Sequence, residues 1–460
     1  MKLKNNSFVL LLICGILSEI FYLIFIILNK DRNISLYMLV YFESFILFFF
    51  GYFLITKKQI DRESNNDSIP GAALVQSKLL KILNINSNER IKLKIPLLII
   101  SFGIIFRITL LLTSYTTSDD IHRYLWEGKV LVNGHNPFTT PPNDSSLIYL
   151  QDDNFEKVTF KNISAIYPPL SQIVFAVNYL IGGNSTIFLK IIYLIFELLT
   201  LIFILKILVL KGKDPKLVLL YAWLPLPIME YFINAHLDLI GITFLILFIY
   251  YFEKQKYHTS SIMLALAFLT KLLALFLLPL VIKKVGLKKA LIFYAIFSLI
   301  CLIFYLPFIS KNSDILSGLL KYVAHWEFNG SIYNLIKFVF SRGDIAKMVC
   351  AVLLSFSVLI ISFRYKNFLN GVFAIILCVV IFSTTLYPWY LGWIAALNVF
   401  VGFFSVLSLF FTINFSNFTP LAEKWKEYPI VWIIEYVPFY SLLFYDLWKR
   451  KVRYKDADKD

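Results

Sequence analysis

SDDIHRYLWEGKVLVNGHNPFTTPP, residues 118–142, is the stretch around which the chain is organised. It is a long polar, multiply charged segment that follows directly on an apolar run. Asp119 and Asp120 stand side by side just past that run, close to a low-dielectric boundary. Two like charges there raise the free energy of the doubly ionised state, which favours a nearby cation or a raised pKa for one carboxyl. The pair is therefore a candidate for a catalytic base, or an N-cap for a helix over 121–132; the two interpretations are compatible.

The composition indicates an integral membrane protein. Of 460 residues, 59% are hydrophobic and only 16% are charged, against about 25% charged in soluble domains. The formal net charge of +15 does not indicate nucleic-acid binding, because Lys and Arg occur in short tracts between apolar runs. Such tracts are typical of cytoplasmic loops and of surfaces that attract anionic lipid.

Apolar runs of near-spanning length predict an all-α, polytopic membrane protein with about 13–14 transmembrane helices. The first run lacks a cleavage site, so we expect an uncleaved anchor. Several later runs are too short to span upright, which predicts a hairpin of half-depth helices near Thr270 and Lys271. The runs lie at residues 7–29, 35–56, 95–115, 185–210, 217–233, 237–252, 258–270, 272–283, 289–309, 345–363, 369–386, 388–401, 401–415 and 429–448.

The positive-inside rule orients these helices. The N-terminus, the Lys- and Arg-rich loop 57–94 and the root of the tail KRKVRYKDADKD are basic, so we expect them to be cytoplasmic. That orientation places the segment after residue 115 outside the cell membrane. We expect one membrane domain over 1–460, whose parts are the N-terminal helices with the cytoplasmic loop (1–94), a first external loop (116–183) and a second external loop (310–346). Pro168 and Pro169 suit the first turn of a helix that lies along the interface or re-enters.

Ionisable residues inside apolar helices are the next indication of a site, because each costs about 2.5–3.5 kcal/mol at mid-depth on insertion scales. Any one of them more often snorkels or forms a structural ion pair. As a set in the outer half of the bilayer, they favour a functional site. Lys271 stands alone in LALAFLTKLLALFLLPL, where its cation suits a lipid-borne phosphate. The set is Arg107, Glu197, Glu230, His236, Asp238 and Lys271.

Two further stretches combine aromatic and hydrogen-bonding side chains in predicted external positions. HWEFNGS begins at His325 and contains Trp326 and Asn329, and YPWY covers residues 387–390. Aromatic faces beside amides or carboxylates suit a sugar ring, although an interfacial aromatic belt is the common alternative.

Taken in order, the motifs resemble a known family. SDDIHRYLWEGKVLVNGHNPF, IYPPL, LYAWLPLPIMEYFINAHLD, a lone LTK, HWEFNGS and LYPWYLGW together resemble the polyprenyl-phosphate-mannose-dependent mannosyltransferases of the GT-C glycosyltransferase superfamily. The similarity runs from about Asp119 to Tyr390. Its specific part is DDxxRYxW(D/E)G…GxNP(Y/F). This chain departs from the usual pattern in having Glu127 where Asp is usual, and HLD in place of a His-Asn-Asp.

The resemblance implies a GT-C-like helical bundle whose catalytic external loop contains short interfacial helices. It implies transfer of a hexose, mannose above all, from a polyprenyl phosphate to a glycan, lipid or protein acceptor on the external face, with inversion. Asp120, four residues before Tyr124, would be the base, with Asp119 supporting it; Lys271 or Arg123 would bind the donor phosphate. The expected sugar and acceptor residues are Tyr124, Trp126, Glu127, His236, Asp238, His325, Trp326, Asn329, Tyr387, Trp389 and Tyr390.

We expect no cofactor. The chain lacks a Rossmann-like Gly-rich turn for a nucleotide sugar, and adjacent aspartates without further carboxylates at defined spacing are weak evidence for a divalent metal. Two other functions stay open. A transporter or flippase of lipid-linked sugars would show paired repeats and charges near the midplane. An O-antigen-ligase-like enzyme would share the topology but rely on external Arg and His residues.

Overall fold

The computed structural model describes residues 7–29, 32–56, 93–310, 314–422 and 425–457, and throughout this part the chain is helical, with no strand. Within these ranges, seven helices are long and apolar enough to cross a membrane. The predicted all-α, polytopic membrane fold is therefore confirmed. Most of the predicted cytoplasmic loop, residues 57–92, lies outside the described residues, as does the end of the basic tail.

The candidate spans are formed by the longest apolar elements. They are α1 (Ser7–Leu28), α2 (Ile34–Thr56), α9 (Thr186–Leu210), α15 (Leu287–Tyr305) with η4 (Leu306–Phe308), α18 (Gly343–Arg364), α21 (Phe404–Thr412) with η6 (Ile413–Asn417) and α22 (Phe418–Leu421), and α23 (Pro429–Ala457). The remaining helices that matter for the site are α5 (Lys94–Leu110), α6 (Asp120–Val132), α7 (Asp153–Glu156), α8 (Pro169–Gly182), α12 (Asp238–Glu253), α16 (Ser317–His325), α17 (Ser331–Phe340), α19 (Phe368–Phe382), η5 (Pro388–Leu391) and α20 (Gly392–Val401).

Some predicted crossings are broken into short helices. The run 217–233 forms η2 (Pro215–Val218), α10 (Leu219–Ala222) and α11 (Pro225–Phe232), and the run 258–283 forms α13 (Tyr257–Phe268), η3 (Leu272–Leu277) and α14 (Leu278–Val285). Proline stands in the first turn of η2, α11 and α14, where its missing N–H costs nothing and its ring stops the preceding helix. The helix breaks near Thr270 and Lys271, between α13 and η3, whereas the predicted hairpin of half-depth helices stays a prediction. The total number of crossings stays a prediction.

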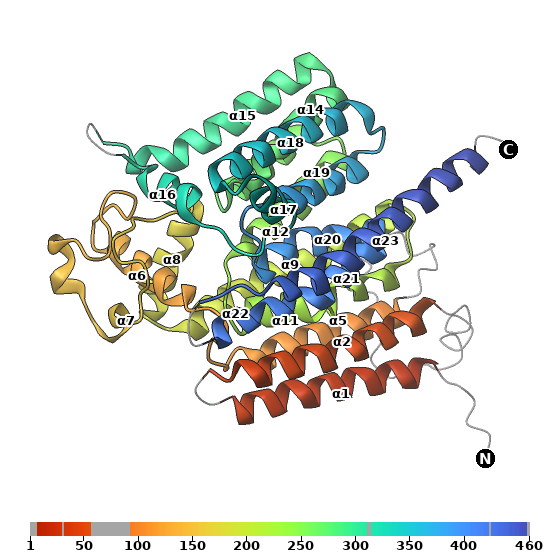
Figure 1. Ribbon diagram of the computed structural model, residues 1–460, viewed down its shortest axis with the longest axis horizontal. Coiled ribbons are helices and arrows are strands. Elements are labelled where there is room, and N and C mark those ends of the chain that lie inside the picture. Colours follow the sequence, from red (N-terminus) through yellow and green to blue (C-terminus); the bar gives the residue numbers. More distant parts are fainter. Residues whose placement is uncertain (1–6, 30–31, 57–92, 311–313, 423–424, 458–460) are drawn as a thin grey trace.

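Figure 1 shows how the helices are distributed along and across the long axis of the molecule. Helices α6, α7 and α8 gather at one end of the long axis, and the C-terminal part of α23 reaches the other. α1 packs on α2 and α5 along one side. α14, α15, α18 and α19 lie on the opposite side, with α9, α12 and α20 between the two groups.

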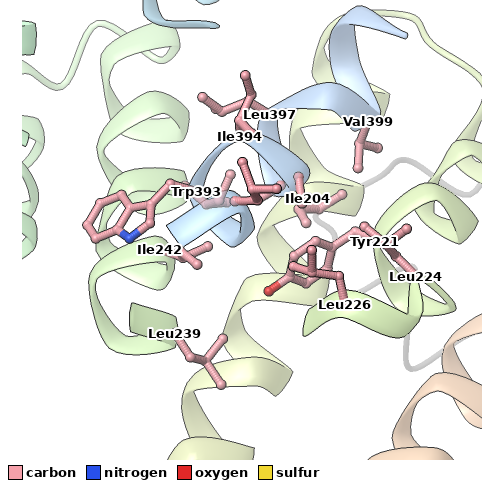
Figure 2. Packing of buried hydrophobic residues seen from close by; sticks show 14 of the residues in the cluster. Ile204, Tyr221, Leu224, Leu226, Leu239, Ile242, Trp393, Ile394, Leu397 and Val399 are labelled. Carbon is pink, nitrogen blue, oxygen red and sulfur yellow. The ribbon is translucent and has the colours of Figure 1, made fainter. Parts of the chain in front are cut away.

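The core beside the site is packed by α9, α10, α11, α12 and α20 (Figure 2). Trp393 of α20 lies against Gly241 of α12, where an added Cβ would come within 2.6 Å of the indole. Glycine therefore lets the indole approach the α12 backbone. The Trp393 Nε1–H donates to Asp238 Oδ1 at 2.7 Å. The core thus fixes a carboxylate at the start of α12.

Close packing of α6 on α8 positions the polar segment. The rings of Tyr124 and Phe175 stack at 4.7 Å with an interplanar angle of 8°. Gly128 lies directly against the α8 backbone, because an added Cβ would be 2.5 Å from the carbonyl carbon of Phe175. The glycine of the WEG motif therefore allows α6 to pack closely against α8.

Gly128→Ala should destabilise the fold and displace α6. The added methyl group meets backbone that cannot rotate away, and overpacking of this kind costs about 1–3 kcal/mol. We expect a lower thermal midpoint in detergent by differential scanning fluorimetry. Gly51→Ala in α2 is the matched control, because its nearest contact would be 3.5 Å and alanine favours a helix. Equal midpoints for the two variants would contradict this packing argument.

Candidate active site

A cavity of about 570 Å³ opens beside the N-terminus of α6. It brings together segments that lie far apart in sequence: the first external loop, the end of α16 with the loop that follows, η5, and the segment around α22. The lining includes Asp119, Asp120, Arg123, Tyr124, Phe160, Tyr167, Tyr322, His325, Trp326, Phe328, Tyr387, Trp389, Tyr390, Asn417 and Trp425. Glu327 also lines the cavity, so the wall combines three carboxylates with many aromatic faces.

The two aspartates are not used for capping. Asp119 occupies the N-cap position of α6, as predicted, but its side chain makes no capping hydrogen bond. The Asp120 N–H donates instead to the Ser118 hydroxyl at 3.3 Å. Both carboxylates are therefore left to face the cavity, which removes capping by side chain as an alternative explanation for the pair.

Asp120 has the environment of a general base. The Tyr124 hydroxyl donates to its Oδ2 at 3.5 Å, and His236 Nδ1 lies 3.8 Å from the same oxygen. Burial, and then the neighbouring Asp119, raise the pKa of Asp120 to about 7 although Lys271 and Arg123 act in the opposite direction. The side chain still has 35% of its surface exposed. A carboxyl group with these properties can exchange protons with a bound molecule near neutral pH.

His236 reaches Asp120 through a tightly held turn between α11 and α12. Asn234 accepts the backbone N–H groups of Thr116 and Thr117, both at 3.0 Å. This ties the turn to the start of the first external loop. Ala235 has φ 57°, a left-handed conformation that is rare for residues with a Cβ and that often marks functional turns.

Lys271 and Asp238 form an ion pair with an Nζ–Oδ1 distance of 2.7 Å. Lys271 also lies 3.4 Å from the centroid of the Tyr390 ring, which lines the cavity. The lysine therefore stands behind the cavity wall with its charge partly neutralised, while Asp238 is buried. Both side chains belong to the site region, but neither is among the lining residues.

Four stacked rings connect Phe328 with His236, which lies beside Asp120. Phe328 stacks on Tyr387 at 4.5 Å, Tyr387 on Trp389 at 4.4 Å, and Trp389 on His236 at 3.6 Å. The Tyr390 and Tyr322 hydroxyl groups share a hydrogen bond of 2.7 Å. YPWY and HWEFNGS, predicted to lie in the same site, are therefore brought together.

Arg123 fixes the loop that forms one side of the cavity. Its Nε donates to Glu127 Oε1 at 2.6 Å, and its Nη atoms donate to the carbonyl oxygens of Phe160 (3.1 Å) and Ile163. Glu127 also accepts from Gln172 Nε2 at 2.7 Å. The guanidinium borders the cavity, whereas Glu127 is buried in this network outside the lining.

Two other expected sugar contacts lie elsewhere. Trp126 is buried in a separate cluster with Phe155. Residues three, four and seven positions after Asp120 share its face of α6. Trp126 stands six positions after Asp120 and therefore lies on another face. Asn329 is buried and donates to Glu435 Oε2 at 2.7 Å. These two side chains support the walls and do not line the cavity.

The structure also adds residues that sequence reasoning did not select. Tyr322, Tyr167, Asn417 and Trp425 line the cavity. Tyr167 stands in the IYPPL motif, which was a usable signal. Asn417 and Trp425 come from the C-terminal part of the chain, and nothing in their local sequence separates them from other interfacial residues.

The six ionisable residues that were predicted to lie within the membrane divide into two groups. Arg107 and Glu197 form an ion pair of 2.6 Å in which neither side chain is exposed, and Arg107 Nη1 also donates to the Gly103 and Ala222 carbonyl oxygens, both at 2.7 Å. This pair joins α5 to α9 and does not border the cavity. The other four, Glu230, His236, Asp238 and Lys271, lie around Asp120.

All four cysteines lie in the described part of the chain and carry free thiols, and those of Cys14 and Cys350 are buried. Within the described ranges, no three His, Cys, Asp or Glu side chains are grouped closely enough to hold a metal ion.

Comparison with known proteins adds one finding. Residues 96–285 match the model of the MptA_B family. That model is described as an alpha-(1->6)-mannopyranosyltransferase, N-terminal domain. The matched region contains the aspartate pair and Lys271, and ends before the second external loop and YPWY. No curated protein matches the chain. The match supports a membrane-embedded mannosyltransferase.

Proposed function

We propose that this mannosyltransferase-like protein moves a hexose, most directly mannose, from a polyprenyl-phosphate donor to a hydroxyl acceptor on the external face of the cell membrane. The observation that carries the proposal is the Asp120 carboxylate, which lies in the wall of an aromatic cavity and accepts a hydrogen bond from the Tyr124 hydroxyl. An aromatic wall suits the faces of sugar rings. A carboxylate beside it suits proton removal from the acceptor.

The reaction follows from this arrangement. Asp120 takes the proton of the acceptor hydroxyl while that oxygen forms a bond to the anomeric carbon. The bond from that carbon to the phosphate oxygen breaks on the opposite face, so the configuration inverts and polyprenyl phosphate leaves. The anionic carboxylate also stabilises oxocarbenium-like charge, by analogy with glycoside hydrolysis.

Two cations are available for the leaving phosphate. Arg123 borders the cavity, and Lys271 stands behind Tyr390. Each is paired with a carboxylate, Glu127 and Asp238 respectively. We propose that the donor phosphate binds on this side, where both cations stabilise its developing charge. The carboxylate partners hold the cations in position before the donor arrives.

The arrangement of the helices supports an external site. The C-terminal part of α23, which is basic in sequence, lies at the end of the molecule opposite α6 and α7 (Figure 1). Under the positive-inside rule the basic end is cytoplasmic. The cavity then opens on the extracytoplasmic side, where lipid-linked sugars are the available donors.

The direct test is transfer by purified protein in detergent. Radiolabelled polyprenyl-phosphate mannose is the donor and octyl α-mannopyranoside the acceptor. We expect label to move from the lipid to the octyl glycoside, with no transfer when GDP-mannose replaces the lipid. Transfer from GDP-mannose alone, or consumption of neither donor, would overturn the proposal.

The rate should depend on pH through Asp120. Its pKa is raised to about 7, and only the ionised form accepts a proton. We therefore expect kcat/KM to fall roughly tenfold per pH unit below that value and to reach a plateau above it. Rates measured from pH 5.5 to 8.5 check this. A flat profile would show that no group of this pKa acts as the base.

A further inference from the structure

A buried pair, His236 and Glu230, stands directly behind Asp120. The His236 side chain has no exposed surface; its Nδ1 lies 3.8 Å from Asp120 Oδ2 and its Nε2 lies 3.6 Å from Glu230 Oε2. Neither ring nitrogen has a hydrogen-bond partner elsewhere in the described part of the chain. The three groups therefore form a line from the cavity wall into the protein interior, with the imidazole between two carboxyl groups.

The ring is held in this orientation by its surroundings. Trp389 stacks on His236 at 3.6 Å with an interplanar angle of 12°. Asn234, in the same turn, donates to Glu230 Oε2 at 3.1 Å and to Thr117 Oγ1 at 2.7 Å. With the ring plane fixed on one side and the turn anchored on the other, the nitrogens can address only Asp120 and Glu230. Separations slightly beyond hydrogen-bond length commonly shorten when substrate binds.

The number of protons shared by Asp120, His236 and Glu230 determines whether both contacts of the imidazole can be hydrogen bonds. A neutral imidazole has one N–H and one lone pair. The His236 side chain is fully buried, and burial favours the neutral form of an imidazole. If both carboxyl groups were ionised, one of them would face the lone pair. Both contacts become hydrogen bonds only when one carboxyl group carries a proton.

The difference in burial between Glu230 and Asp120 indicates that Glu230 carries this proton. Glu230 has no exposed surface; it accepts from the Tyr37 hydroxyl at 2.8 Å and from Asn234. Among the described residues, no lysine or arginine forms an ion pair with it. Asp120 is partly exposed, and Lys271 and Arg123 act on it. A charge costs far more in the buried, uncompensated position.

Building on the proposed function, we propose that His236 and Glu230 are positioning residues for the base. Glu230 keeps its proton and donates it to His236 Nε2, and the Nδ1–H of His236 donates to Asp120 Oδ2. Asp120 Oδ1 is then left for the acceptor hydroxyl, whose proton it takes as the new glycosidic bond forms and the bond to the phosphate breaks. His236 and Glu230 retain their protons throughout. The other titratable groups that interact with these three are Asp119, Arg123, Tyr124, Asp238, Lys271, Tyr37, Tyr41, Tyr167, Tyr231, Tyr322, Tyr387 and Tyr390.

Two substitutions separate this role from simple packing. His236→Phe keeps a ring that can stack on Trp389 but removes the N–H to Asp120. Loss of a donor raises the pKa of a carboxylate, so the acid limb of kcat/KM should move to higher pH. We expect kcat to fall about 10- to 100-fold while the KM for the lipid donor changes less than about twofold. Glu230→Gln supplies a permanent amide donor to Nε2, so kcat should stay within about threefold of wild type with the acid limb unmoved.

Each outcome supports or overturns the positioning role of His236 and Glu230. If Glu230→Gln is as impaired as His236→Phe, Glu230 acts as an anion and the proposed proton arrangement is wrong. If His236→Phe lowers kcat without moving the acid limb, His236 only packs. Thermal midpoints establish folding; should the Phe variant fail to fold, His236→Gln, whose amide can still donate to Asp120, must retain more activity than His236→Ala. An inactive wild-type protein would instead count against the proposed function itself.

Discussion

Replacing Asp120 by asparagine should lower kcat for hexose transfer by about 10²- to 10⁴-fold, the usual contribution of a positioned acid or base. Asparagine has nearly the same shape and retains an oxygen for the Tyr124 hydroxyl, but it cannot take a proton from the acceptor. The change leaves the aromatic walls intact, so donor binding should remain. Purified variant and wild type are compared with the labelled polyprenyl-phosphate donor at pH 8, where the wild-type carboxyl group is ionised.

The control for this experiment is Asp153→Asn. Asp153 lies in the same external loop at the start of α7, is exposed, and does not line the cavity. Its activity should match wild type. The thermal midpoint of Asp120→Asn at pH 8 should equal or exceed that of wild type, because a carboxyl group whose pKa is raised to about 7 opposes folding once it is ionised. Equal activity of the two variants would remove Asp120 from its role.

Breaking the Arg107–Glu197 pair should produce the largest loss of stability. Both side chains are fully buried, so Arg107→Leu leaves an uncompensated carboxylate inside the bundle. Such a change costs about 3–5 kcal/mol. The Tyr221 hydroxyl, which donates to Glu197 Oε2 at 3.2 Å, cannot replace the lost cation. We expect a greatly reduced thermal midpoint and poor recovery from detergent extracts.

The double variant Arg107→Leu/Glu197→Leu tests whether the stability lost in Arg107→Leu comes from the uncompensated charge of Glu197. Replacing a buried ion pair by apolar residues of similar volume is often neutral or stabilising, so the second substitution should recover much of the midpoint lost by the first. A double variant that is no more stable than Arg107→Leu would mean that the hydrogen bonds to the Gly103 and Ala222 carbonyl oxygens, and not the charge balance, dominate.

Local patterns predicted a large part of the fold. The lengths of the apolar runs predicted the long helices and the interruption near Thr270, because run length is a property of each segment alone. Helix periodicity also explains one side of the site. Asp120, Arg123 and Tyr124 share a face of α6 and reach the cavity, whereas Trp126 falls on another face and packs in a core cluster.

Long-range pairing was not predictable in the same way. Six intramembrane ionisable residues suggested one site, but nothing in the sequence shows that Arg107 pairs with Glu197 while Lys271 pairs with Asp238. Each pair joins different helices, so the choice depends on how the bundle packs. The contributions of Asn417 and Trp425 to the cavity depend on the same packing. The stack of four rings from Phe328 to His236 likewise needs three separate segments in place.

The most direct test of the central claim, that sugar transfer takes place in the cavity beside Asp120, is photolabelling with a polyprenyl-phosphate mannose analogue that carries a diazirine on the sugar. Mass spectrometry of the labelled protein should locate the adducts on peptides that contain Asp120–Tyr124, Tyr322–Phe328 or Tyr387–Tyr390. Excess unlabelled donor should suppress them. Labelling instead around Tyr257, His258 and Lys289, which line a separate cavity beyond the far end of α12, would contradict the account.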